Sequence, residues 1–353
     1  DTTPKTATFT AVSGDGFFAN TSGGAFNINL PAGTAGAIVS VADYAATWQT
    51  NNVTVVPNGS DKIGSQNENA VLSTEGQSVT FVFVDSTQGW INTMDSTSNV
   101  RGAPPYITAT GGNITTSGND KIHTFPGPGT FTVCSVASSA ADNAVAYMVV
   151  AGGGGNGNAG SGGGAGGFRE GTTAPIVPYT ASPLVNSSGI TVTAQSYSIS
   201  IGAGGGCAAQ GSNTTALGLT STGGGNGGNR PGGGGSGGSG GGASDFSTSP
   251  GGTGNDPPVS PPQGNNGGAG SSGENGGGGG GATTAGGNTT GVPGTGATTQ
   301  ITGSAVIYSA GGAGDGASPA PGPPTPRANT GGGSSTADAG AGSGIVVIRY
   351  RFQ

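Results

Sequence analysis

Charged side chains are scarce in this sequence. Lysine, arginine, aspartate and glutamate make up only 7% of the 353 residues, against about a quarter of an ordinary soluble domain. The lysines, Lys5, Lys62 and Lys121, stand far apart, and the net charge is −7 at pH 7. Nucleic-acid binding depends on clustered cations that displace counterions from phosphates. The sequence therefore predicts no nucleic-acid partner.

Long apolar segments are also missing. No stretch approaches the roughly 18 consecutive apolar residues of a membrane-spanning helix, so we expect no membrane insertion. The N-terminal sequence DTTPKTATFT has no charged region followed by an apolar run and does not predict a signal peptide.

Cys134 and Cys207 are too few for a disulfide framework. We expect both to be unpaired, with Cys134 as a small buried thiol in the strand-like sequence TFTVCSV.

Residues with catalytic potential are equally few. His123 is the single histidine, and Asp120 is the carboxylate close to it in sequence. A general base needs a nucleophile and an orienting partner, and the sequence identifies neither. We interpret His123 as a structural residue and predict that the protein is not an enzyme.

Two glycine motifs resemble ligand-binding loops, but their surroundings do not fit. GGGGNG at residues 152–157 satisfies G-x-G-x-x-G, yet no helix or suitably spaced acidic residue follows, and the sequence has no G-K-[ST]. GGTGND at residues 251–256 matches the start of a calcium-binding nonapeptide. However, Pro257 and Pro258 follow it, and no second copy appears at nine-residue spacing. We therefore predict no cofactor and no metal site.

Glycine, by contrast, is abundant and unevenly distributed. Of the 80 glycines, 16 precede residue 151 and the rest follow it. A shift of composition this sharp predicts a domain boundary. We divide the chain into an N-terminal β module at residues 1–100, a linker at 101–118 and a glycine-rich domain at 119–353.

The N-terminal module consists of short strand-like runs separated by turn residues. Runs such as AGAIVSVADY and QSVTFVFVD are alternating or β-branched, which favours strands, and no window has a helical period. We predict an all-β fold that begins with a small sandwich-like module. Its expected core contains the aromatic residues Phe17, Phe26, Tyr44, Trp48, Phe81, Phe83 and Trp90.

The second half begins with weaker signals. Residues 98–120 are polar and rich in turn residues, which is typical of a linker or of two weak edge strands, and KIHTFPGPGTFTVCSV at 121–136 predicts a hairpin. Three apolar strands then lead directly into glycine tracts, in NAVAYMVVAGG, SYSISIGAGG and SAVIYSAGG. Because this order repeats, we interpret the tracts as connections within one domain.

Glycine tracts can be ordered as polyproline-II helices, which have three residues per turn and no internal hydrogen bonds. Without Cβ atoms, such helices can approach closely and hydrogen-bond to one another. Ordering a residue costs ~1–2 kcal/mol of backbone entropy, whereas a net hydrogen bond contributes only ~1 kcal/mol. We therefore expect a packed array of glycine helices held in register by β-strands. The alternative is a disordered low-complexity segment.

Several runs occur in a characteristic order: NDKIHTFPGPGTFTV, AYMVVAGGGGNGN, SGGGAGGFREG, SYSISIGAGG and GSGIVVIRYRF. Together they cover about residues 119–353 and resemble the glycine-rich domain of tailed-phage fibres and adhesins, especially those of phages that infect marine bacteria such as cyanobacteria. Residues 7–98, which include VDSTQGWINTMDSTSN, resemble a small β module of phage fibres.

The resemblance implies a virion-surface appendage, a tail fibre or adhesin, that is usually trimeric, joins other virion proteins and contacts a host-surface glycan or protein. Adhesins of T-even-like phages bind receptor through loops at the tip of a glycine-helix lattice. This sequence has fewer aromatic residues between its tracts, so no motif assigns its tip loops. Alternatives are a head fibre or capsid decoration protein, and a secreted ice-binding or surface-matrix protein. The threonines within residues 283–299 hint at ice binding but lack a strict three-residue period.

Interruptions of the glycine tracts are the candidate receptor contacts. They combine ring, charge and amide groups suited to a carbohydrate or protein partner, and they are Phe168, Arg169, Asn229, Arg230 and Phe246. Each phenylalanine has a competing interpretation as a core residue that anchors its tract against the sheet. The two arginines are the better candidates for exposure.

Overall fold

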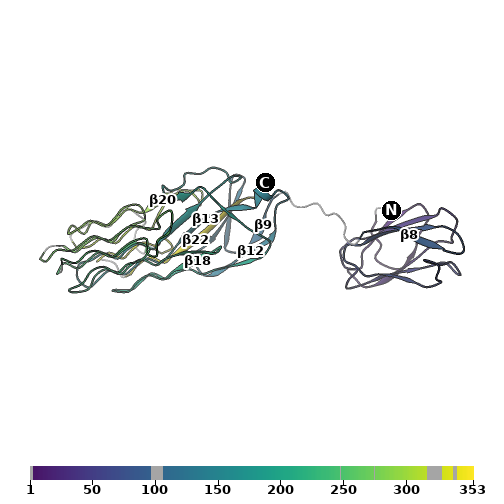
Figure 1. Ribbon diagram of the computed structural model, residues 1–353, viewed down its shortest axis with the longest axis horizontal. Helices are drawn as coiled ribbons and strands as arrows, with labels where there is room; N and C mark the ends of the chain where they lie inside the picture. The colour runs from purple at the N-terminus through teal and green to yellow at the C-terminus, as the bar shows by residue number, and fades with distance from the viewer. Residues whose placement is uncertain (1–2, 97–105, 247, 274, 316–327, 337–339) are drawn as a thin grey trace. The chain divides into compact units, whose positions relative to one another are not determined.

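The computed structural model describes residues 3–96, 106–246, 248–273, 275–315, 328–336 and 340–353. The fold is all β, as predicted; among the described residues the helical structure is a single 3-10 turn, η1 (Ala140–Asn143). The chain divides into two compact units, residues 1–102 and 103–353, which are coloured purple to blue and blue to yellow in Figure 1.

The first unit is built from two four-stranded sheets. One sheet has the order β1-β3-β5-β6 and the other the order β2-β4-β7-β8. The strands of the first sheet are β1 (Phe9–Thr10), β3 (Phe26–Asn29), β5 (Val53–Val56) and β6 (Ala70–Leu72). Those of the second are β2 (Gly16–Ala19), β4 (Ile38–Asp43), β7 (Ser78–Phe83) and β8 (Trp90–Ser96).

Alternating side chains of both sheets form the core of the first unit. Trp48 and Trp90 are fully buried in it, and the indole N–H of Trp48 donates to the carbonyl oxygen of Ala19 at 3.3 Å. Six of the seven aromatic residues predicted for this core are buried there. The prediction is wrong for Tyr44, which is 57% exposed because it follows the last residue of β4 on the outer face of the sheet.

A seven-stranded sheet frames the second unit, with the order β10-β11-β22-β13-β14-β15 and β16 paired to β13. Its strands are β10 (Asn113–Ser117), β11 (Asp120–Phe125), β22 (Ile345–Arg351), β13 (Ala144–Val150), β14 (Phe168–Gly171), β15 (Val185–Asn186) and β16 (Ile190–Thr191). A three-stranded sheet pairs β12 (Gly129–Ser135) with β17 (Ser196–Ile199) and β9 (Thr108–Thr110). Two small hairpins are β18 (Thr214–Ala216) with β19 (Leu219–Ser221), and β20 (Ala297–Thr299) with β21 (Val306–Tyr308).

Strands β13 and β22 pair antiparallel at the centre of the large sheet and are buried on both faces. Val145, Tyr147 and Val149 pack into one core cluster together with residues of β9, β12 and β17. Met148 and Val150 pack into a second cluster on the opposite face, together with residues of β20 and β21. Burial on both faces explains the continuous apolar runs of these two strands, because a strand with one wet face would alternate.

Two sequence predictions about the start of this unit are wrong. The linker expected at 101–118 contains β9 and β10, each at the edge of a sheet of the second unit. The alternative interpretation of residues 98–120 as two edge strands is therefore confirmed. The hairpin expected at 121–136 does not form: β11 pairs with β10 and β22, whereas β12 pairs with β17 and β9. Both edges of β11 are thus occupied by other strands, one of which comes from the far end of the chain.

Between the strands, the glycine tracts form a packed array of extended segments, called the glycine array below. In the segment 151–157, successive backbone N–H groups bond to different neighbours, and the same neighbour recurs at every third residue. Segment 161–167 accepts from Ala151, Gly154 and Gly157; segment 209–213 accepts from Gly152 and Gly155; segment 340–344 accepts from Gly153. A period of three is that of polyproline II, whereas a β-strand has a period of two.

The array is too close-packed for side chains at most of its positions. The carbonyl groups of segment 151–157 accept N–H groups from three further segments, 202–206, 223–228 and 331–336, so neighbours surround it. A Cβ atom added at Gly154 would overlap the carbonyl oxygen of Gly225. Figure 1 shows the segments running side by side away from β13 and β22 towards loops at the opposite end of this unit. The described tracts are ordered, as predicted.

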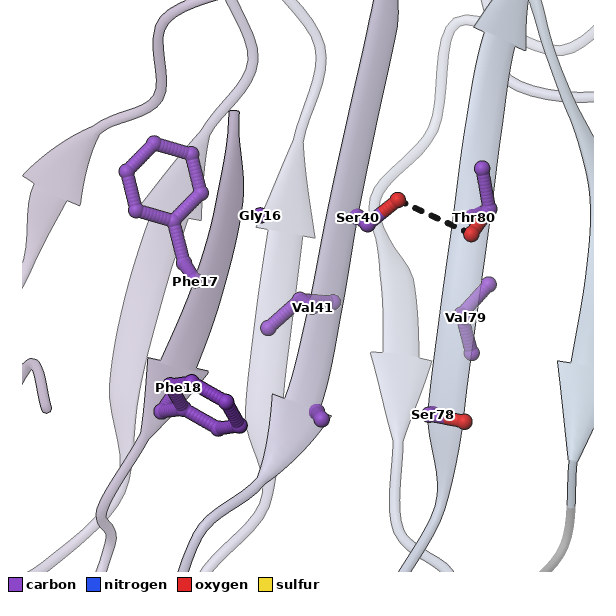
Figure 2. Close-up of a pocket in the computed structure, with 9 residues that line it drawn as sticks. Gly16, Phe17, Phe18, Ser40, Val41, Ser78, Val79 and Thr80 are labelled. Atoms are coloured by element: carbon purple, nitrogen blue, oxygen red, sulfur yellow. Dashed lines mark hydrogen bonds between the residues drawn. The ribbon is translucent and has the colours of Figure 1, made fainter. Parts of the chain in front are cut away.

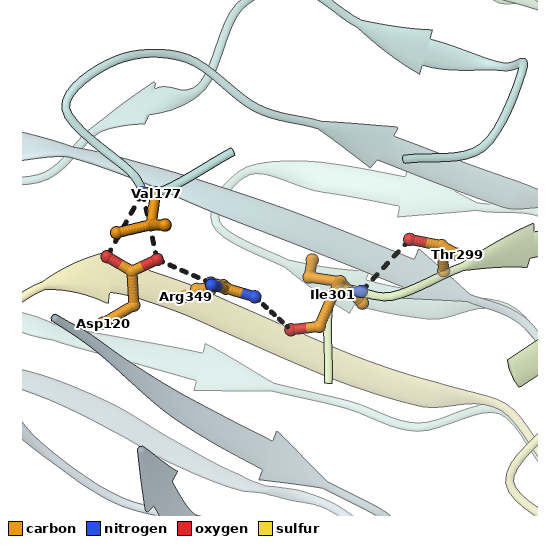
Figure 3. A network of polar contacts seen from close by, with 5 residues as sticks. All are labelled: Asp120, Val177, Thr299, Ile301 and Arg349. Carbon is orange, nitrogen blue, oxygen red and sulfur yellow. Dashed lines mark hydrogen bonds and ion pairs between the residues drawn. The ribbon is translucent and has the colours of Figure 1, made fainter. Parts of the chain in front are cut away.

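A buried ion pair ties two loops to the large sheet (Figure 3). The guanidinium Nε of Arg349 donates to Oδ2 of Asp120 at 2.7 Å, and both side chains are almost fully buried. The carboxylate also accepts the backbone N–H of Val177 at 3.1 Å, and Nη1 of Arg349 donates to the carbonyl oxygen of Ile301 at 3.4 Å. The pair therefore fixes the loop that precedes β15 and the loop that follows β20 against β11 and β22.

We expect Gly154→Ala to lower the free energy of unfolding of the second unit by about 2 kcal/mol or more, because overpacking forces the backbone apart. Calorimetry of the unfolding transition of the second unit measures the loss. This transition proceeds without a change in tryptophan fluorescence, because Trp48 and Trp90 lie in the first unit. The control is Gly206→Ala, where an added Cβ would meet nothing within 4 Å. Equal stability of the two variants would contradict the close-packed array.

We expect Asp120→Asn to lower the same free energy by about 3–5 kcal/mol, because the substitution leaves the buried charge of Arg349 without its counter-ion. The same calorimetric transition measures the loss. Asp142→Asn, in the partly exposed turn η1, serves as the control and should change stability by less than about 0.5 kcal/mol. A small effect at both positions would mean that the ion pair does not hold the loops.

Candidate functional site

The turns at the far end of the glycine array form one connected surface, called the loop end below. It comprises residues 158–160, 207–208, 229–231, 245–246 and 271–273, together with Asp315. Backbone hydrogen bonds join its turns: Asp245 N–H to Ala159 O at 3.2 Å, Gly273 N–H to Asp245 O at 3.1 Å, Asp315 N–H to Gly160 O at 2.9 Å and Ala208 N–H to Asn156 O at 2.7 Å. Side chains are thus presented from a fixed backbone.

Arg230 and Phe246 stack on each other at the loop end. The guanidinium carbon of Arg230 lies 3.0 Å from the centroid of the Phe246 ring, although both side chains are exposed and the ring is 44% accessible. Their turns are held together because the N–H of Ser244 donates to the carbonyl oxygen of Gly232 at 3.1 Å. An exposed cation–π contact contributes about 0.5–1 kcal/mol, which orders the pair while leaving its outer surface open.

Asn229 belongs to the same group. Its side-chain Oδ1 accepts the backbone N–H of Asn158 at 3.2 Å, so the amide NH2 group remains at the exposed surface. Three of the five predicted contact residues, Asn229, Arg230 and Phe246, therefore lie together at the loop end. Sequence reasoning had also allowed Phe246 to be a core anchor, and its exposure overturns that alternative.

The other two predicted contacts, Phe168 and Arg169, lie on β14 at the sheet end of the array. Phe168 is only 1% exposed and packs in the core cluster with Met148 and Val150, so it is an anchor and cannot contact a partner. Arg169 is half-buried and donates from Nη1 to the carbonyl oxygen of Thr220 at 3.3 Å. The structure therefore does not bring the five candidate residues together, and the burial of Phe168 confirms the competing interpretation of this residue as a core anchor.

Sequence reasoning missed Ala159 as a part of the loop end. The carbonyl oxygen of Ala159 accepts the N–H of Asp245, and the carbonyl oxygen of Asp245 accepts the N–H of Gly273. The available signal was the end of each glycine run, since residues with side chains appear where the array stops. Nothing in the sequence shows which of these ends meet in space.

His123 is enclosed by structural partners. Its Nδ1 lies 2.6 Å from the carbonyl oxygen of Gly111, and its Nε2 lies 3.2 Å from the hydroxyl of Tyr350. Because a carbonyl only accepts, Nδ1 carries the proton in the neutral ring and Nε2 accepts from Tyr350. Asp120 points away to Arg349, as expected for residues of opposite parity on β11. Burial lowers the pKa of His123 below its ordinary value of 6.5.

The other candidate residues of the sequence have ordinary surroundings. Cys134 and Cys207 are both free, and both are exposed; the expected burial of Cys134 is wrong because its side chain lies on the outer face of β12. In the GGTGND sequence, Gly252 and Asp256 donate backbone hydrogen bonds within the array.

The described residues contain no group of three or more His, Cys, Asp or Glu side chains that could hold a metal ion. No helix among them is long and apolar enough to cross a membrane.

Comparison with known proteins gives one match. A family model described as a glycine-rich domain matches residues 124–351, which run from the end of β11 to the end of β22 and include the glycine array and the loop end. The search of curated proteins found no match.

We expect the free energy of unfolding of the second unit to fall as the pH drops from 7 to 5. An unfolded histidine titrates near pH 6.5, whereas burial depresses the pKa of His123 in the folded protein. The stabilisation is therefore fully present above about pH 6.5 and is lost as the pH falls towards the folded pKa. The slope can reach about 1.4 kcal/mol per pH unit.

Calorimetry of the second unit at pH 5, 6 and 7 measures this slope. No other histidine contributes between pH 5 and 7, because His123 is the only histidine in the chain. Carboxylates ordinarily titrate near pH 4, below this range. His123→Gln should remove the slope. The same pH dependence in wild type and variant would show that other groups cause it.

Proposed function

We propose that this chain, which belongs to the glycine-rich domain family, is a non-enzymatic structural protein of a tailed-phage fibre or adhesin. In this proposal it lies at the virion surface, joins other virion proteins as a trimer and contacts a host-surface glycan or protein through its loop end. The support comes from the order of strands and glycine tracts in the sequence and from the construction of the array.

The array suits a rigid spacer. Its interior consists of backbone groups that hydrogen-bond between neighbouring segments, so it carries few side chains that could perform chemistry or bind a ligand. Side chains with ring, charge and amide groups appear where the segments turn. The exposed, ordered pair of Arg230 and Phe246 is the single observation that carries the assignment of the contact surface.

Arginine and aromatic residues dominate the energetics of protein contacts, and their ordering before binding lowers the entropic cost of association. Arg230 is held on the ring of Phe246, and the backbone of both turns is fixed by hydrogen bonds. A partner therefore meets a preformed surface. This is the property expected of a receptor contact at the end of a spacer.

The threonines within residues 283–299 favour this proposal over ice binding. Thr283 and Thr284 hydrogen-bond with the hydroxyl of Thr295 at 2.8 and 2.9 Å. Their hydroxyl groups are therefore committed to one another in a cluster rather than spread at regular intervals over a flat face.

We expect the full chain, fluorescently labelled, to bind selectively to some strains in a panel of bacteria that includes marine cyanobacteria. Arg230→Ser combined with Phe246→Ser should weaken binding at least about tenfold, because both anchors of the contact are lost. The double variant should keep the melting temperature of the wild type, since both side chains are exposed. Flow cytometry over a range of protein concentrations measures the affinity.

The matched control replaces another arginine–aromatic pair, Arg351 and Tyr106, whose guanidinium carbon lies 5.2 Å from the ring centroid. Arg351 is the last residue of β22, at the end of that strand away from the glycine segment 340–344. Binding that is lost with the control pair and kept with the loop-end pair would overturn the proposed contact surface. Electron microscopy that finds the protein on capsid facets would identify a head fibre or decoration protein instead.

A further inference from the structure

The outer face of the sheet β2-β4-β7-β8 in the first unit carries a groove of about 430 Å³ (Figure 2). Gly16, Ser40, Ser78 and Thr80 lie in it and come from three adjacent strands. These residues alternate with buried ones such as Val79, which faces the core. The groove is thus formed by the small, outward-facing side chains of the sheet, and its volume is in the range of about 300–1,000 Å³ typical of ligand sites.

Small side chains in the groove are not required by packing. A Cβ atom added at Gly16 would meet only the Cβ of Ser40, at 3.9 Å, which is ordinary van der Waals contact. Its backbone also lies outside the left-handed region that favours glycine. Gly16 therefore leaves space at the bottom of the groove that a larger residue could have filled without strain.

Aromatic rings border the groove and remain in contact with water. Phe18, which lines the groove, is 45% exposed, and the neighbouring Tyr44 is 57% exposed. Their rings lie edge to face with centroids 6.5 Å apart. Figure 2 shows Phe18 beside the groove, whereas Phe17 is the neighbouring ring that packs into the core. No described residue of the first unit buries this pair of rings.

Hydroxyl groups occupy the middle of the groove. Oγ of Ser40 lies 2.9 Å from Oγ1 of Thr80, and Ser78 stands two residues before Thr80 on the same face of β7. Each hydroxyl can both donate and accept, so the row can exchange hydrogen bonds with a ligand that also has hydroxyls. The residues that line the groove carry no charge.

This chemistry selects one class of ligand. A charged ligand would find no counter-charge among the lining residues. A purely apolar ligand would leave the hydrogen-bonding capacity that remains beyond the bond between Ser40 and Thr80 unsatisfied, at an energetic cost. A neutral sugar satisfies both halves of the groove, since its hydroxyls match Ser40, Ser78 and Thr80 and its apolar C–H face matches the ring of Phe18. We propose that this groove binds a neutral saccharide.

The saccharide groove belongs to the first unit, and the loop end belongs to the second unit. The proposal therefore does not rest on the function assigned to the glycine array. Arg230→Ser should leave saccharide binding unchanged, which keeps the two proposals separable by experiment.

Isothermal titration calorimetry of the full chain tests the proposal with neutral probes: di- and trisaccharides of glucose, galactose, mannose and N-acetylglucosamine, at up to about 10 mM. Sialyllactose is the charged comparison. We expect at least one neutral probe to bind more tightly than sialyllactose. Phe18→Ser should weaken its affinity about tenfold or more, and Thr80→Val about threefold to tenfold, as expected for a lost ring contact and a lost hydrogen bond.

Matched controls are available in the other sheet of the same unit. Val71→Ser removes an exposed apolar side chain, and Thr10→Val removes an exposed strand hydroxyl; both should leave affinity unchanged. Failure of all neutral probes to bind, or binding that Phe18→Ser does not weaken, would overturn the proposal. Self-association that Phe18→Ser abolishes, without saccharide binding, would show instead that a second copy of the chain covers this face.

Discussion

The second unit depends on hydrogen bonds between the backbones of neighbouring glycine segments. These backbones lie in direct contact because glycine has no side chain between them. The donors of segment 151–157 reach three neighbours in turn, and its carbonyls accept from three others. Such bonding in all directions around an extended chain needs a period of three and the close approach that only glycine allows. Each ordered residue costs ~1–2 kcal/mol in backbone entropy against ~1 kcal/mol per hydrogen bond. The array alone is therefore marginal.

The β frame supplies what the array lacks. Strands β13 and β22 are buried on both faces, and each is continuous with a glycine segment: β13 leads into segment 151–157, and segment 340–344 leads into β22. Pairing of these strands thus fixes where two segments start. Phe168 directly follows segment 161–167 and is buried in a core cluster together with residues of β13 and β22. Hydrophobic burial at the ends of the segments, at about 25 cal/mol per Å², offsets the entropy lost along them.

Local patterns predicted the parts of this structure that depend on local chemistry. Apolar runs identified β13 and β22, and strand-then-glycine repetition indicated an ordered array. The pairing of β11 with the C-terminal strand could not be predicted, because the FPGPG turn looks like a hairpin and the true partner lies more than 200 residues away. Phe168 and Phe246 each follow a glycine-rich run, yet one is buried and the other exposed. Only their position at the sheet end or the loop end separates them.

The two units therefore present their exposed side chains in different ways. In the glycine array, close backbone contact leaves no room for a Cβ atom at most interior positions, so larger side chains are found mainly at the turns. In the first unit, each strand presents alternate side chains outward, and a groove arises where those side chains are small. Substitution of an exposed turn residue such as Arg230 leaves the backbone hydrogen bonds of the array intact, whereas substitution within a segment disturbs several neighbours at once. A scaffold built this way tolerates change where a partner would contact it and resists change elsewhere.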